Sequence, residues 1–122
     1  MKDDVIDKIK FTLRCFVDLA FTLKFKNETE WTINLKEEIG KLGIQYGYSV
    51  RASGFDKEWL YDIVWCKKDI NGSLTSVSLV VESEWKRSLI EISYDFEKLL
   101  LSNSPIKLMI CQAYTNKNRR SY

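Results

Sequence analysis

The chain has 122 residues, of which 45% are hydrophobic and 30% are charged, and these proportions are typical of one ordered globular domain. Its 19 basic and 17 acidic residues give a net charge of +2, which excludes a general attraction to polyanions and leaves nucleic-acid contact to a local patch. The sequence contains no histidine, which excludes zinc hydrolases and nucleophiles activated by histidine within this chain.

The cysteines indicate a reducing compartment, so we expect a cytoplasmic protein. They are widely spaced, form no Cys-x-x-Cys pair and are embedded in apolar runs that suggest small core side chains: Cys15, Cys66 and Cys111. The apolar stretch of residues 11–23 is too short to span a bilayer and is interrupted by Arg14 and Asp18. We therefore expect no membrane segment, and the first residues show no signal-peptide profile.

Residues 3–26 are predicted to form a helix with Asp3 or Asp4 as its N-cap. One face carries apolar side chains at helical spacing, namely Val5, Ile9, Leu13, Phe16, Val17, Ala20 and Leu23. Other apolar side chains widen this stripe, namely Phe11, Cys15, Leu19 and Phe21. Two interpretations follow: the helix is wedged into its own core, or it also packs against a second copy and forms a homodimer.

A second helix and three strands are expected next. The helix begins at Thr29 or Glu30 after a polar break and ends or loosens at Gly43. The strands are expected at residues 46–52, 59–65 and 77–85, with a turn at residues 53–56. Their short connections predict an antiparallel meander.

The C-terminal part is predicted to return to the sheet through a helical crossover. A helix at residues 89–102 stops before Pro105, and the apolar run of residues 105–114 suits a strand covered on both faces and parallel to a neighbour. Residues 1–122 are thus expected to form one domain with three parts: an N-terminal helix in residues 1–28, a core in residues 29–114 and a basic tail in residues 115–122.

The strand at residues 77–85 is apolar but ends in two carboxylates. Because side chains alternate along a strand, Glu82 and Glu84 project from one face and Ser83 projects from the other. Burial of an unpaired carboxylate is costly, so the two glutamates require either a cation or a solvated edge position.

A third acid comes from the preceding strand. Asn71 and Gly72 form a strong hairpin signal, since both residues tolerate positive φ. An antiparallel hairpin folded there brings Asp62 beside Glu82 and Glu84. Three carboxylates on two paired strands form an all-oxygen ligand set, which suits Mg²⁺ or Mn²⁺.

Asp62 followed by Glu82-Ser83-Glu84, on the second and third strands of this order, resembles the PD-(D/E)XK nuclease superfamily. The resemblance covers residues 30–114 and implies an α/β, restriction-endonuclease-like fold: an αβββαβ core with a mixed central sheet flanked by helices, here with an extra N-terminal helix. The chain departs from the usual pattern at one position. Glu84 replaces the lysine that normally follows the glutamate by two residues, as in the restriction enzymes that carry Glu-x-Glu.

The resemblance also implies roles for individual side chains. Asp62, Glu82 and Glu84 would hold one or two divalent ions that polarise a phosphodiester, activate water and stabilise the leaving oxygen. The cation missing from the lysine position would come from Lys86, in phase with Glu84, or from Lys98, because the family's lysine sometimes lies on the following helix.

An acid on the first core helix often joins the metal site in this family, and Glu38 occupies that place. Each of these residues also has a plainer interpretation. Lys86 and Lys98 would be surface charges, and Glu38 would be a solvated or ion-paired glutamate.

Two classes of function therefore remain open. The first is a divalent-metal-dependent nuclease, or a nucleic-acid-binding protein derived from one, with DNA as the expected partner. The second is a catalytically inactive domain of the same fold that acts as a protein interaction or oligomerisation module. The replaced lysine, the small size and the near-neutral charge favour the second class, whereas three acids on two paired strands favour the first.

Overall fold

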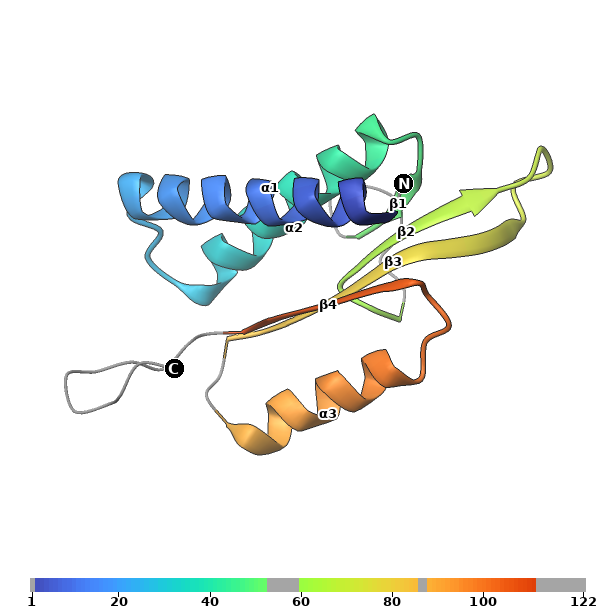
Figure 1. The fold of residues 1–122 in the computed structure, drawn as a ribbon. Coiled ribbons are helices and arrows are strands. Elements are labelled where there is room, and N and C mark those ends of the chain that lie inside the picture. The colour runs from blue at the N-terminus through green and yellow to red at the C-terminus, as the bar shows by residue number, and fades with distance from the viewer. Residues whose placement is uncertain (1, 53–59, 86–87, 112–122) are drawn as a thin grey trace.

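The computed structural model describes residues 2–52, 60–85 and 88–111. In chain order they form α1 (Lys2–Leu23), α2 (Glu28–Gln45), β1 (Ser49–Arg51), β2 (Ile63–Lys68), β3 (Leu74–Glu84), α3 (Leu89–Leu100) and β4 (Ile106–Cys111). Figure 1 shows the sheet between two helical layers, with α1 and α2 on one face and α3 on the other. The protein is therefore an α/β domain with a three-layer arrangement of its described elements.

The sheet has the order β1-β2-β3-β4. β1 pairs with β2 and β2 pairs with β3 in antiparallel fashion, whereas β4 lies parallel to β3. α3 connects β3 to β4, as expected for a crossover between parallel strands. The predicted meander, crossover helix and parallel last strand are all confirmed.

The β2–β3 hairpin turns at the expected place. The Gly72 amide donates to the carbonyl of Asp69 (3.0 Å), and the Asp69 amide donates to the carbonyl of Ser73 (2.9 Å). The Asp69 side chain accepts from the amides of Asn71 and Ser73. Gly72 has a φ of +84°, whereas Lys24 is the only non-glycine residue with positive φ in the described ranges. Within this turn, positive φ is therefore needed at Gly72 and not at Asn71. The turn is a longer loop than the two-residue turn in which Asn-Gly is favoured because both residues have positive φ.

Of the two alternatives for Gly43, the one in which it ends the second helix is wrong, because α2 continues to Gln45. The amides of Tyr46 and Gly47 cap the helix by donating to carbonyls in its last turn, and Gly47, with φ +86°, is the residue that allows the chain to leave. Gly43 has a different purpose. A Cβ atom at this position would lie 2.5 Å from Nε1 of Trp65, so the glycine makes room for the indole ring.

Several other boundaries differ from those expected. α1 ends at Leu23, where Lys24 adopts φ +57°, and not at residue 26. β1 covers only Ser49–Arg51, because the cap of α2 occupies the residues before it. β2 begins at Ile63 and ends at Lys68, so the expected strand at residues 59–65 is displaced toward the hairpin. The expected turn at residues 53–56 and the tail at residues 115–122 lie outside the described residues.

Two apolar clusters hold the layers together. The larger one joins α1 and α2 to one face of the sheet and is centred on Trp65, whose Nε1 donates to the carbonyl of Ile39 (3.1 Å). The smaller one lies between the other face and α3 and includes Tyr61, Val80 and Leu99. Side chains of β2 and β3 thus alternate between two buried environments, which explains why both strands are apolar over most of their length.

The three cysteines are free thiols, and only Cys66 is buried. The expectation that Cys15 and Cys111 are core side chains is wrong: Cys15 is exposed in a groove between α1 and α2, and Cys111 is exposed at the end of the edge strand β4. Of the helices in the described ranges, none is long and apolar enough to cross a membrane.

Candidate functional site

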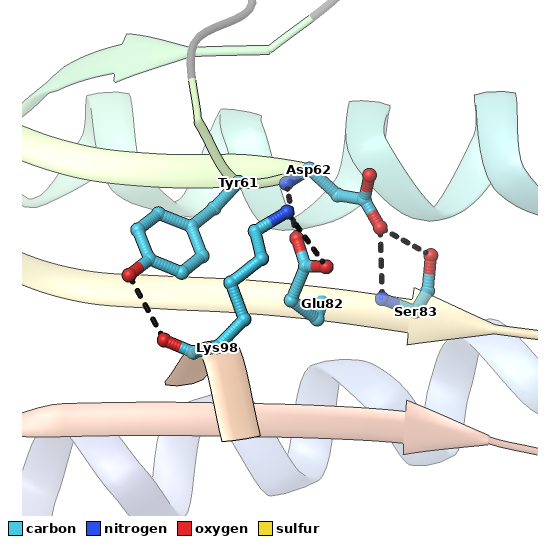
Figure 2. Close-up of polar contacts among 5 residues, drawn as sticks. All are labelled: Tyr61, Asp62, Glu82, Ser83 and Lys98. Carbon is cyan, nitrogen blue, oxygen red and sulfur yellow. Dashed lines mark hydrogen bonds and ion pairs between the residues drawn. The ribbon is translucent and has the colours of Figure 1, made fainter. Parts of the chain in front are cut away.

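Five side chains from three elements form a polar network on the edge of the smaller cluster (Figure 2). Tyr61 and Asp62 lie in the bend that precedes β2, Glu82 and Ser83 are in β3, and Lys98 is in α3. The register of the hairpin explains why they meet. Ile63 pairs with Val81, so the next residue back along the chain, Asp62, reaches the position of Glu82.

Glu82 is the centre of the network. Only 3% of its surface is exposed, and both of its carboxylate oxygens have a donor. Oε1 accepts from the backbone amide of Asp62 (3.0 Å), and Oε2 lies 3.3 Å from Nζ of Lys98. A buried carboxylate is thereby held by one main-chain donor and one cation.

The Asp62 carboxylate makes its own contacts. Its Oδ2 accepts from the backbone amide of Ser83 (2.8 Å) and from the Ser83 hydroxyl (3.0 Å). Because β2 begins only at Ile63, the aspartate side chain replaces the strand neighbour that Ser83 would otherwise have on this side. Figure 2 shows the Asp62 carboxylate directed at Ser83 and the Glu82 carboxylate directed at Lys98.

Tyr61 fixes the helix end of the network. Its hydroxyl donates to the backbone carbonyl of Lys98 (3.1 Å), and Nζ of Lys98 lies 5.4 Å from the centroid of the tyrosine ring. The same tyrosine therefore contacts both the main chain and the ammonium group of Lys98. Because 29% of the lysine side chain is exposed, its charge remains accessible from solvent.

Burial and, after it, the negative charge of Asp62 raise the pKa of the Glu82 carboxyl to about 7, against the opposing effects of the Asp62 amide and of Lys98. The carboxyl therefore changes its charge near neutral pH. Such a group can exchange a proton for a cation without a large change in pH, which is a property of functional carboxylates.

The other acids named from the sequence are placed differently. Glu84 is half-buried two residues further along β3, where alternation puts it on the same face as Glu82. Glu38 lies in a groove between α1 and α2, and its carboxylate is 3.9 Å from Nζ of Lys41. α2 covers the face of the sheet opposite α3, so Glu38 is not brought to Glu82. Lys86 lies outside the described residues.

Asp62, Glu82 and Lys98 are thus brought together in the structure. Within residues 2–52, 60–85 and 88–111, no three acidic or cysteine side chains converge closely enough to form a ready metal cage. Two residues of the network escaped the sequence analysis. Ser83 was assigned to the opposite face by alternation, and Tyr61 has no motif. The only sequence signal for either residue is that it is adjacent to a candidate acid.

Comparisons of the chain with protein-family models, with curated protein sequences and with solved structures find no significant match.

Proposed function

We propose that this protein is a divalent-metal-dependent phosphodiesterase that acts on nucleic acid, with DNA as its substrate, on a restriction-endonuclease-like core. The order of α2, three antiparallel strands, α3 and a parallel β4 supports this proposal. So does the presence of Asp62 and Glu82 at neighbouring ends of β2 and β3. The observation that carries the proposal is the buried Glu82 carboxyl, which has a pKa of about 7 and forms an ion pair with the partly exposed Lys98.

The donor types suit Mg²⁺ or Mn²⁺, although three acids do not converge into a ready metal cage within the described residues. Asp62, Glu82 and Glu84 offer carboxylate oxygens, which are the hard ligands that these ions prefer, and the network contains no soft sulfur donor. When bound, such an ion polarises the phosphodiester and lowers the pKa of a water molecule. Glu82 would release its proton on binding the ion, and Ser83 would keep the Asp62 carboxylate in place through its two hydrogen bonds.

Lys98 would supply the positive charge that Glu84 cannot supply. Its ammonium group lies at the Glu82 carboxylate, and the side chain is partly exposed, so it can contact an anionic phosphate oxygen. A fixed cation near the phosphate stabilises the charge that develops in the transition state. Tyr61 limits the positions that the Lys98 side chain can adopt, because it contacts both the carbonyl and the ammonium group of this lysine.

A second candidate function is an interaction module without catalysis. The observation in its favour is that Lys98 already compensates Glu82 and Ser83 already satisfies one Asp62 oxygen. A network of this kind can persist as structure alone, because a buried acid paired with a cation and an amide does not require a metal.

Thermal unfolding and cleavage of DNA, each with and without Mg²⁺ or Mn²⁺, separate the two candidates. For the nuclease we expect the ions to stabilise the fold, by roughly 2.7 kcal/mol at a hundredfold excess over the dissociation constant. Glu82→Ala should lose both the stabilisation and the cleavage. At a pH well above the pKa of Glu82, where its carboxyl is ionised in both proteins, Lys98→Ala should keep the stabilisation and lose cleavage by about 10²-fold or more, because its charge acts on the transition state.

Lys41→Ala is the matched control, since Lys41 is an exposed lysine that pairs with Glu37 on α2, on the other face of the sheet. Its metal response and its cleavage rate should equal those of the wild type. A wild-type protein with neither response would refute the nuclease and leave the interaction module.

A further inference from the structure

α3 is apolar on the side that faces the sheet and on its outer side, whereas Glu91, Asp95 and Lys98 form one polar flank. Leu99 packs against the sheet, and Ile92, seven residues earlier, lies on the same side of the helix and is partly buried. The outer side is apolar as well, and it exposes six large side chains to between 48% and 86% of their surface: Leu89, Ile90, Tyr94, Phe96, Leu100 and Leu101. Figure 1 shows α3 alone on its face of the sheet, so none of the other labelled elements covers this side. A helix with one buried stripe does not need these side chains.

The six side chains form one continuous face, here called the outer α3 face. At 3.6 residues per turn they fall within an arc of roughly 160° of the helix. Only Ser93 and Glu97 interrupt the arc. Lys98 lies on the flank that faces Glu82, so a partner on the outer α3 face would leave the polar network accessible.

We propose that the outer α3 face binds the same face of a second copy of this chain, with the two helices antiparallel across a two-fold axis. Ile90, Tyr94, Glu97 and Leu101 follow one another with spacings of four, three and four, the pattern of a helix–helix seam. This pattern reads the same in both directions, so an antiparallel pair aligns it with itself. Ile90 then meets Leu101 of the partner subunit.

The polar residues of the seam are complementary in this arrangement. Tyr94 meets the partner's Glu97, and Glu97 meets the partner's Tyr94. The tyrosine hydroxyl is a donor and the glutamate carboxylate is an acceptor. Each of the two Glu97 side chains, the only charged ones in the seam, therefore has one hydrogen-bond donor in the other copy. A parallel arrangement would instead place the two Glu97 carboxylates opposite each other, which is unfavourable.

The exposed area is sufficient for a stable dimer. Ile90, Tyr94 and Leu101 in the seam expose on the order of 500 Å², and the three apolar side chains on the flank of the face bring the total to about 800 Å², which is what one partner contributes to an interface of standard size. A contiguous apolar patch of this size is unusual on a monomer. The charges on α3 also disfavour a membrane surface as the partner, since the helix carries Glu91, Asp95 and Glu97 but only one lysine.

α1 offers a less suitable surface for self-association. Its exposed apolar side chains include Phe11, Val17, Leu19 and Phe21, but they are spread over roughly 200° of the helix and are separated by Arg14 and Asp18. Dimerisation through this helix, the alternative expected from the sequence, would therefore bury charged groups together with the apolar ones.

Sedimentation equilibrium on the full chain tests the proposal. We expect a dimer for the wild type. For Ile90→Glu and for Leu101→Glu we expect a dimer dissociation constant at least tenfold higher, because each substitution buries a charge opposite an apolar side chain. Both residues are mostly exposed within one chain, so these variants should keep the far-UV circular dichroism and the thermal melting of the monomer. Phe11→Glu on α1, at 56% exposure, is the matched control and should dimerise as the wild type does.

A double-mutant cycle tests the orientation. Tyr94→Phe should weaken the dimer because it leaves a buried carboxylate without its donor, and Glu97→Leu added to it should restore dimerisation. A wild type that is still monomeric at roughly 100 µM overturns the proposal. So does a dimer that Phe11→Glu dissociates and Ile90→Glu does not, which would assign the interface to α1. A monomer that binds lipid vesicles through the same residues also overturns it.

Discussion

The titration of Glu82 can be measured as a change in stability, and the Glu82→Gln variant isolates it. Glutamine has nearly the shape of the glutamate but no charge, so it mimics the protonated side chain at every pH. The wild-type carboxyl has a pKa of about 7 in the folded protein, against an ordinary value of 4.5 for glutamate. The difference in unfolding free energy between variant and wild type should therefore depend on pH in a defined window.

The sign follows from proton linkage. Below pH 4.5 the carboxyl is protonated in both states, and it contributes no slope. Between pH 4.5 and about 7 the folded state holds a proton that the unfolded state has lost, so the wild type loses stability as the pH rises. Above about 7 the loss is complete. At roughly 1.4 kcal/mol per pKa unit, it amounts to about 3 kcal/mol relative to Glu82→Gln.

Urea denaturation of both proteins at intervals from pH 4 to 9, without divalent ions, gives the difference directly. Glu37→Gln is the control, since it removes one carboxylate from a half-exposed position on α2 and changes the net charge equally. We expect the Glu82→Gln curve to separate from the wild type across the window and then to run parallel above it. Curves that stay parallel from pH 4 to 9 would refute the assignment of a raised pKa to Glu82.

Three further predictions concern single substitutions. Lys98→Ala should raise the pKa of Glu82 above its wild-type value, so the same urea series should show the loss of stability extending to higher pH; an unchanged window would mean that the 3.3 Å ion pair is not formed in solution. Gly43→Ala should lower the unfolding free energy by about 2 kcal/mol or more, because overpacking against Trp65 outweighs the better helix propensity of alanine; an unchanged melting temperature would contradict this. Gly72→Ala should lower the unfolding free energy by about 1 kcal/mol, since it forces an alanine to φ +84°; equal urea midpoints for variant and wild type would disprove this prediction.

The layers and the approach of Asp62 to Glu82 could be predicted because they depend on local rules. Apolar periodicity distinguishes helices from strands, and the turn at Gly72 pairs β2 with β3. The register next to the turn alone would place Asp62 opposite Val80, and two register shifts along the hairpin bring it to Glu82. Lys98 was also a candidate, but through the resemblance, which implies that the lysine sometimes lies on the helix after the third strand. These inferences involve short connections, where sequence separation and spatial separation are closely related.

The rest depended on packing that a single sequence does not encode locally. Gly43 has the pattern of a helix terminator, and only the buried ring of Trp65 explains why a glycine is needed inside α2. Tyr61 reaches the α3 side of the sheet because the chain bends before β2 begins, so strict alternation fails there. For the same reason, the contact between Asp62 and Ser83 could not be expected from strand phase.

A last prediction follows from competition at one carboxylate. If Glu82 binds a divalent ion, the ion and the proton exclude each other, because a protonated carboxyl is a poor ligand. Below the pKa of about 7 the ionised fraction falls tenfold per pH unit, so the apparent dissociation constant of Mn²⁺ should rise by roughly tenfold per unit and should level off above pH 7. Calorimetric titration of Mn²⁺ into the wild type at pH 6, 7 and 8 measures this, with proton release at the lower values. An affinity that is constant across these three pH values would mean that Mn²⁺ binds without Glu82, since no other step in its binding requires the loss of that proton.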